Sequence, residues 1–313
     1  MANVYVYDGS GVRSMAAPGE RPLRWAAWRP DGREALIVGN RGTVLRSDGE
    51  RFGTLAAAGA HNLRGAGWSP DGELAILVGN RGAVLLGDGA RFEELPPVTT
   101  ENLRRVAWSP DGSYALIVGN GGCVLRYERA SRALLPLPGD RAHTMRSVAW
   151  RPDGAYALIG GYASRYAGYP RPHVLYRCDG RYTQGILATD DEDDALAIDW
   201  QPGATPARAL VLVASYGEDG SVTNKALEYL GWGVRSRVLE APATLLGAAW
   251  HPSGSYALVC GERGVLLRAD DSGDLTAVAS GTADNLVGPF WKPGVKSPVA
   301  LMLKGPDEKV YTI

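Results

Sequence analysis

Several residue types and patterns are scarce in this chain of 313 residues, and each shortage excludes something. Its three cysteines, Cys123, Cys178 and Cys260, form no CxxC pair, which argues against a disulfide framework and favours reduced thiols in a cytoplasmic protein. No apolar run reaches the roughly 18 residues that span a bilayer. The first residues lack the basic-then-apolar order of a signal peptide. A formal net charge of −1 gives no general attraction for nucleic acid or an anionic membrane.

Patterns for catalysis and cofactor binding are equally scarce. The four histidines have no metal-ligand spacing, and the chain contains no G-x-S-x-G elbow, P-loop or dinucleotide-binding fingerprint. The acidic runs 190–194 and 270–274 do not follow the calcium-loop pattern, and we expect 190–194 to be a solvated loop. The sequence therefore predicts no catalytic residue, no metal ion and no cofactor. It favours a protein that is not an enzyme, although an enzyme stays open as an alternative.

A repeated pattern is the strongest feature that is present. Seven of the nine tryptophans stand at matching points, separated by 40, 40, 42, 50, 50 and 41 residues: Trp28, Trp68, Trp108, Trp150, Trp200, Trp250 and Trp291. Segments 23–62 and 63–102 are identical at 21 of 40 positions. Such a period predicts an array of one structural unit. The copies are 23–62, 63–102, 103–144, 145–194, 195–244, 245–285 and 286–313 together with 1–22.

Each copy divides into four short strands, a to d. In the third copy, strand a is 103–108, strand b 114–118, strand c 123–127 and strand d 134–137. Pro-Asp-Gly and Gly-Asn-Gly-Gly segments provide the turns between them. Strand b is apolar without alternation, which predicts burial on both faces. The tryptophans, set beside small residues, fit packing between copies better than ligand binding.

Four strands in each unit of 40 to 50 residues predict an all-β, seven-bladed β-propeller formed as a single domain over residues 1–313. We expect N-terminal strands to complete the last blade and close the ring. On this prediction the last copy ends after strand c, at Lys309–Ile313, and the N-terminus adds the outer strand. Val4–Tyr7 and Lys309–Ile313 both have the pattern of strand c, so the choice between them stays open.

The run VAWSPDGSYALIVGNGGCVLR at 106–126 resembles the WD-repeat and related propeller superfamily. The resemblance extends over residues 23–313. It implies a propeller fold and, because these propellers mostly mediate interactions, a role in binding. The Gly-His pair before strand a and the Trp-Asp pair at the end of strand c are both missing, so no subfamily is identified.

The first functional hypothesis concerns an enlarged segment of the fourth copy. Its b–c connection is a Gly/Pro-framed loop that carries Tyr162, Arg165, Tyr166, Tyr169 and Arg171, a composition favoured at recognition surfaces. The enlarged segment 216–224 and the acidic run 190–194 fall on the same predicted face. We therefore expect a non-catalytic scaffold that presents blades four and five to a protein or peptide partner. We expect the protein to be a monomer, with no nucleic-acid or membrane partner.

The alternative concerns the second residue of strand a, which is Arg24, Arg64, Arg104 and Arg146 in copies one to four and Leu196, Leu246 and Val287 in the others. At a channel mouth these arginines would bind an anionic ligand, such as an acidic peptide or the acidic substrate of an enzyme. A purely structural role competes with this hypothesis, because strict alternation places each arginine on the side of the tryptophan. We expect Asp199, inside strand a of copy five, to pair with one of them.

A carbohydrate-binding propeller is the second alternative. It requires the same exposed polar group in every blade. Arg41, Arg81 and Arg263, at the tips of the b–c turns, are the repeated candidates, and the third copy has Gly121 instead.

Overall fold

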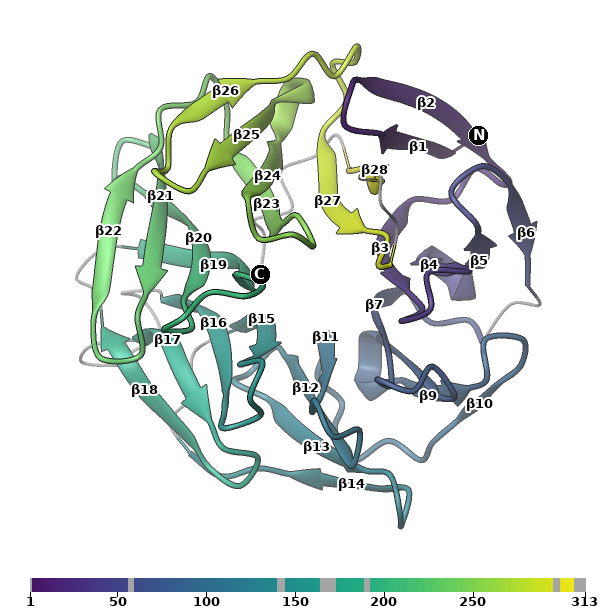
Figure 1. Cartoon of the computed structure of the whole chain (residues 1–313). Coiled ribbons are helices and arrows are strands. Elements are labelled where there is room, and N and C mark those ends of the chain that lie inside the picture. Colours follow the sequence, from purple (N-terminus) through teal and green to yellow (C-terminus); the bar gives the residue numbers. More distant parts are fainter. Residues whose placement is uncertain are drawn as a thin grey trace.

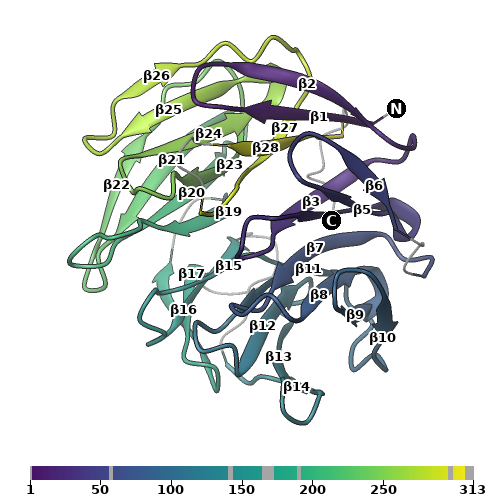
Figure 2. The same cartoon turned by 45° about the vertical axis from the view of Figure 1, so that its right-hand side comes forward.

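The structure, a computed structural model, describes residues 2–55, 59–139, 144–163, 173–188, 192–294 and 299–306. These residues form β-strands, with three-residue 3-10 helices at three b–c turns, η1 (Asn40–Gly42), η2 (Asn80–Gly82) and η4 (Glu262–Gly264). The strands are grouped in four-stranded units arranged around a central axis (Figure 1), and the turned view keeps the same succession (Figure 2).

The units follow the copies of the sequence. Unit one is β3 (Leu23–Trp28), β4 (Ala35–Gly39), β5 (Val44–Ser47) and β6 (Phe52–Thr54). Unit two is β7 (Leu63–Trp68), β8 (Ala75–Gly79), β9 (Val84–Gly87) and β10 (Phe92–Glu94). Unit three is β11 (Leu103–Trp108), β12 (Tyr114–Gly119), β13 (Val124–Glu128) and β14 (Ala133–Pro136). Unit four is β15 (Thr144–Trp150), β16 (Ala157–Ala163), β17 (His173–Cys178) and β18 (Thr183–Ala188).

Unit five is β19 (Glu192–Trp200), β20 (Ala209–Tyr216), β21 (Val222–Tyr229) and β22 (Val234–Val238). Unit six is β23 (Leu245–Trp250), β24 (Tyr256–Gly261), β25 (Leu266–Asp270) and β26 (Leu275–Ala277). Unit seven joins β27 (Leu286–Trp291) and β28 (Ala300–Lys304) to β1 (Ala2–Tyr7) and β2 (Val12–Ala17). The first strand of each unit, strand a, lies innermost (Figure 1).

Antiparallel pairing holds each unit together. Five units are separate four-stranded sheets, and units four and five form one eight-stranded sheet. The link between these two is a short pairing of β16 with β19, Tyr162 opposite Asp194 and Ala163 opposite Asp193. An all-β architecture of repeated four-stranded sheets, predicted from the period, is therefore confirmed.

The N-terminal strands complete unit seven, but not in the predicted way. β1 pairs with β28, with Val4 opposite Leu303 and Val6 opposite Leu301, and β2 pairs with β1. The last copy therefore contributes strands a and b, and the N-terminus contributes both c and d, so the prediction of a single added outer strand was wrong. Val4–Tyr7 is strand c of this unit, whereas Lys309–Ile313 lies outside the described residues.

The core lies between units rather than inside one. In β4, Ala35 and Ile37 point into a cluster shared with unit seven, and Leu36 points into a cluster shared with unit two. This two-sided burial explains why strand b is apolar without alternation, as predicted. The described residues form seven such clusters, one between each pair of neighbouring units, and that between units seven and one includes Val4, Val6 and Ala17. Burying each large aliphatic side chain contributes about 1.5–3 kcal/mol.

The repeated tryptophans add a polar link to this packing. Trp28, Trp68, Trp108, Trp150 and Trp200 are at most 9% exposed, which confirms the predicted core role for these five. The indole N–H of Trp108 donates to the carbonyl of Gly67 at 3.3 Å, in the strand a of the preceding unit. Trp150 donates to Ala107 in the same way at 3.2 Å. Trp25 and Trp232 stand outside this register, and Trp232 is 81% exposed.

The acidic run and the enlarged segment of unit five both contribute residues to strands. Asp193 and Asp194 of the acidic run are buried residues of β19, not part of a solvated loop. The enlarged segment 216–224 of unit five is a hairpin in which β20 and β21 run eight residues each, joined by the turn 217–221. The extra residues are absorbed by longer strands because cross-strand pairing satisfies their backbone groups.

If β1 is an integral strand, trimming its core side chain must weaken the whole domain. Val6 is 1% exposed and packs between units seven and one, so we expect Val6→Ala to lower the free energy of unfolding by about 2 kcal/mol. Chemical denaturation measures this, with Ser14→Ala, an exposed residue of β2, as the control. Equal stability of both variants and the wild type would show that the N-terminus is a dispensable tail.

Candidate functional site

A β-bulge in strand a carries the residues of the site. In β3, Leu23 pairs with Gly39 and Trp25 with Val38, so Arg24 has no partner residue. The same register shift occurs at Arg64, Arg104, Arg146, Leu196 and Leu246. An extra residue at a bulge re-aims its side chain away from the alternation of the strand. The arginines therefore leave the tryptophan side and line a cavity of about 150 Å³, together with Leu196, Leu246 and Val287.

Asparagines in the b–c turns orient three of these arginines. The Nε of Arg24 donates to Asn40 Oδ1 at 3.1 Å and that of Arg104 to Asn120 Oδ1 at 2.6 Å, and Arg64 donates to Asn80 in the same way. Among the described residues, the Nη1 and Nη2 atoms of Arg24, Arg64 and Arg104 make no hydrogen bond. Each of these guanidinium groups is thus fixed through one nitrogen and keeps two for a ligand.

Unit four replaces the asparagine with Tyr162, and its arginine takes a different partner. The Nε of Arg146 lies 2.7 Å from Asp194 Oδ2, and its guanidinium lies over the Tyr162 ring at 5.8 Å. The distance is that of an ion pair, although the angles do not meet those of a hydrogen bond. Asp194 is fully buried, and burial raises the pKa of its carboxyl despite the neighbouring Arg146 and Arg104.

A fifth arginine was not predicted. Arg105 follows the bulge in β11, lies over the Trp25 ring at 3.7 Å from its centroid, and donates from Nη1 to the carbonyls of Arg64 and Arg104, both at 2.8 Å. The Arg105 side chain extends across unit two to Trp25 of unit one. Gly65 of unit two has no side chain that would block this path. A Cβ on Gly65 would lie 2.6 Å from the Arg104 carbonyl oxygen and 3.2 Å from Arg105 Cα.

Positive charge is in excess at this cavity. In the part of the chain that the structure describes, five arginines meet two carboxylates, Asp194 in its ion pair and Glu262 in the lining. Burial and then repulsion by Arg146 and Arg64 lower the pKa of Arg104 to about 9. Burial and then repulsion by Arg104 lower the pKa of Arg105 to about 9 as well. Both groups are charged at neutral pH, so a bound anion would relieve their repulsion.

Below the mouth, a chamber of about 420 Å³ shares Arg105, Leu196, Leu246 and Val287 with it. Asp199 lines this chamber, but the predicted pairing with a channel arginine is wrong. Its Oδ2 accepts the backbone N–H of Trp250 at 2.7 Å. Burial raises the pKa of Asp199 to about 7, against the opposing effect of the backbone N–H donors of Trp250 and Trp200.

The remaining predicted residues have different outcomes. Tyr162, at the end of β16, packs edge-on against Tyr216 with ring centroids 6.5 Å apart, beside Arg146. Arg165, Tyr166, Tyr169 and Arg171 lie outside the described residues. The turn residues Arg41, Arg81 and Arg263 have left-handed backbone conformations with φ of 53°, 56° and 55°.

The asparagines, Arg105 and Asp194 are the residues that sequence reasoning missed. The sequence did contain a signal for the asparagines. An asparagine stands sixteen residues after each of Arg24, Arg64 and Arg104, but not after Arg146. No pattern marked Arg105, and Asp194 was noticed only as part of the acidic run 190–194; the partners of both come from other units.

Within the described ranges, no group of three or more His, Cys, Asp or Glu side chains could hold a metal ion. No helix in that part of the chain is long and apolar enough to cross a membrane.

The repeated sheets and their arrangement define a β-propeller-type protein, and comparison with solved structures agrees. A chain of the Kuenenia stuttgartiensis hydrazine synthase structure aligns with a TM-score of 0.65 and 17% identity, over 80% of this chain and 78% of that one. Likeness at this identity shows the fold alone. A shared fold by itself singles out no function. No protein-family model and no curated protein matches the chain.

The environment of Asp199 makes stability depend on pH. Its pKa rises from 3.8 to about 7 on folding, so the folded state binds more protons than the unfolded state between these values, and stability falls as pH rises through them. We expect the free energy of unfolding to fall by about 2 kcal/mol from this group between pH 5.5 and 8.5.

Asp199→Asn keeps an acceptor for the Trp250 N–H, so it should remove this slope, as measured by denaturation at several pH values. Asp153→Asn, an exposed carboxylate, is the control and should keep the slope of the wild type. An unchanged slope in Asp199→Asn would refute the assignment.

Proposed function

We propose that the protein is a seven-bladed β-propeller, each unit being one blade, and that pairing of β1 with β28 closes the ring. The seven inter-unit clusters support this, because one of them joins unit seven to unit one. The WD-repeat-like superfamily stays a resemblance of the repeat. The free cysteines, of which Cys178 and Cys260 are buried, are consistent with the proposed cytoplasmic location.

We further propose that this propeller is a non-catalytic binding module that holds an anionic group of an acidic peptide or protein partner at the channel mouth. The observation that carries the proposal is the convergence of Arg24, Arg64, Arg104, Arg105 and Arg146 on one cavity, where the described residues supply two carboxylates. Repulsive clustering of partly buried cations is costly in an empty site and favourable around an anion.

The size and lining of the mouth fit the insertion of a single anionic group of a partner. A cavity of about 150 Å³ corresponds to roughly five water molecules, which is room for one carboxylate or phosphate group. Leu196, Leu246 and Val287 line the other half of the mouth, where they would contact the apolar stem that carries the group.

The surroundings of the mouth favour a macromolecular partner over a free ion. β19, β20 and β21 of unit five run eight or nine residues, and Tyr162 and Tyr216 pack together at their ends beside Arg146. The segment with Arg165, Tyr166, Tyr169 and Arg171 follows Tyr162 directly in the chain. Tyr162 and Tyr216, at the described edge of blades four and five, thus lie beside the arginine cluster.

Binding of a labelled peptide tests this function. We use a ten-residue peptide of alternating Glu and Gly, its Gln counterpart, and fluorescence anisotropy. We expect the acidic peptide to bind, the Gln peptide not to bind, and the affinity to fall with added salt. Arg104→Gln should weaken binding about 10- to 100-fold, because it removes a charge-assisted hydrogen bond.

Arg33→Gln, at an arginine whose side chain is 84% exposed in unit one, is the matched control and should change the affinity less than twofold. Thermal unfolding with millimolar phosphate or citrate separates the alternatives. If these ions stabilise the protein but the peptide does not bind, the result would favour a small acidic ligand over a peptide or protein partner. Neither effect, or equal affinity for both peptides, would reject the anion site.

A further inference from the structure

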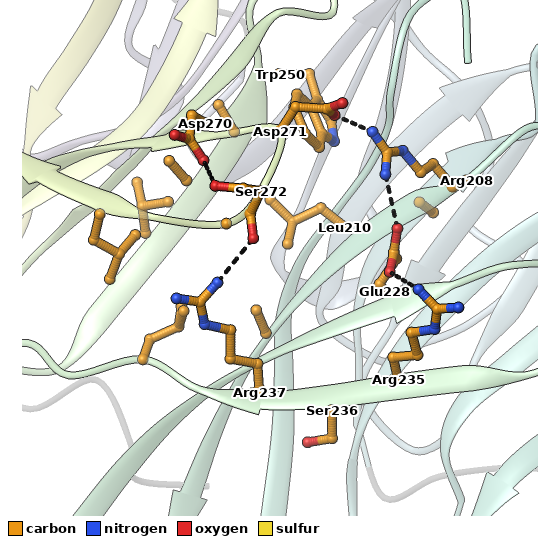
Figure 3. A pocket seen from close by; sticks show the side chains of 18 residues that line it. Arg208, Leu210, Glu228, Arg235, Ser236, Arg237, Trp250, Asp270, Asp271 and Ser272 are labelled. Carbon is orange, nitrogen blue, oxygen red and sulfur yellow. Dashed lines mark hydrogen bonds and ion pairs between the residues drawn. The ribbon is translucent and has the colours of Figure 1, made fainter. Parts of the chain in front are cut away.

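A second cavity lies between units five and six, toward the opposite end of the strands from the arginine cluster. It has a volume of about 350 Å³, within the range of small-molecule sites. Leu246, the second residue of β23, lines the channel mouth, whereas Trp250, the last residue of β23, lines this cavity. Its walls come from β20, β21 and β22 on one side and from β24 and the turn 270–273 on the other (Figure 3).

Packing is incomplete at this junction. Of the clusters between neighbouring units in the described chain, six contain a buried Trp, Tyr or Phe, and the one between units five and six contains none. Its buried members are aliphatic: Leu212, Leu239, Leu245, Ala248, Val259 and Leu267. The aromatic side chain at this junction, Trp250, is only partly buried and lines an apolar-walled space, to which Leu210, Ala226 and Leu275 also contribute.

Trp250 loses the hydrogen bond that its counterparts make. In five other units the indole N–H donates to the carbonyl of the residue before the preceding tryptophan: Trp28 to Phe290, Trp108 to Gly67, Trp150 to Ala107, Trp200 to Ala149 and Trp291 to Ala249. For Trp250 that residue is Asp199, whose carboxylate takes the Trp250 backbone N–H instead.

The Nε1 atom of Trp250 is buried without a hydrogen-bond partner among the described residues. An unpaired buried N–H costs about 1–3 kcal/mol. Trp68 Nε1 is also unpaired, but Trp68 is 7% exposed and belongs to the packed cluster between units one and two. Trp250 is instead only partly buried, and it lines the cavity between units five and six.

The charged rim of the cavity is balanced, unlike the channel mouth. Arg208 contacts both Glu228 Oε1, at 3.0 Å from Nη1, and Asp271, and Arg235 lies 3.8 Å from Glu228 (Figure 3). Arg237 donates from Nη1 to the Ser272 carbonyl at 3.1 Å. The lining holds three arginines and three carboxylates, Glu228, Asp270 and Asp271. No surplus charge is left to attract an ion.

We propose that this inter-unit cavity binds a small, uncharged molecule with an apolar body and one hydrogen-bond acceptor, which the Trp250 indole N–H recognises. An apolar cavity of about 150 Å³ takes one benzene ring, so about twice that volume admits a ring with a substituent or a second ring. The site is independent of the anion site, because they share no lining residue.

The test uses two probes that differ in the acceptor, acetophenone and ethylbenzene, with the intact protein labelled with ¹⁵N. The indole N–H resonances of the nine tryptophans are followed during titration. We expect acetophenone to shift the Trp250 resonance saturably, with little change at the exposed Trp232, and to bind about fivefold more tightly than ethylbenzene. Trp250→Phe identifies the resonance and should make the two probes bind equally.

Ala226→Leu fills the cavity from β21 and should abolish binding of both probes, which keeps the proposal testable if Trp250→Phe fails to fold. Absence of a saturable shift at Trp250 up to the solubility limit of acetophenone would overturn the proposal. Equal affinities of the two probes for the wild type, or unchanged binding in Ala226→Leu, would do the same.

Discussion

The middle strands of this protein are buried on both faces, and the other features of the structure depend on that constraint. Ile37 and Leu36 are neighbours in β4, yet they belong to the cores on opposite sides of the unit. No unit can bury its apolar surface alone, so each requires a neighbour on both sides. The N-terminal strands β1 and β2 meet this requirement for unit seven, where Val4 and Val6 fill the junction with unit one.

The site is formed by equivalent residues in the innermost strands of successive units. The bulge in these strands directs the same position of successive units to one point, so residues about 40 apart in the sequence become neighbours. Repetition multiplies charge there, and the turn asparagines hold the guanidinium groups in place despite their repulsion. A closed ring with identical residues in all units would give a symmetric mouth. Here four arginines face Leu196, Leu246 and Val287, which gives the mouth one cationic and one apolar half.

The departures from the repeat fall in units four to six, and each has a local physical consequence. Tyr162 in place of the turn asparagine releases Arg146 to Asp194 and lengthens the pairing with unit five. Asp199, where other units have Ala, Gly or Phe, accepts the backbone N–H of Trp250, whose indole N–H has no partner among the described residues. A repeat protein can thus acquire a specific site by changing one residue at a position whose neighbours are otherwise held constant.

The sequence by itself determined the units, their strands and their buried residues, because the turn residues and the tryptophan register recur with every copy. It also pointed to Arg24, Arg64, Arg104 and Arg146. Strict alternation would have turned these side chains toward the tryptophans, and only the tertiary structure decided otherwise, since a bulge is defined by pairing with strand b. The same holds for Arg105 over Trp25, Asp194 with Arg146, and the cavity at Trp250. Each arises from contact between different units, and a linear pattern carries no information about which side chains of separate units meet in space.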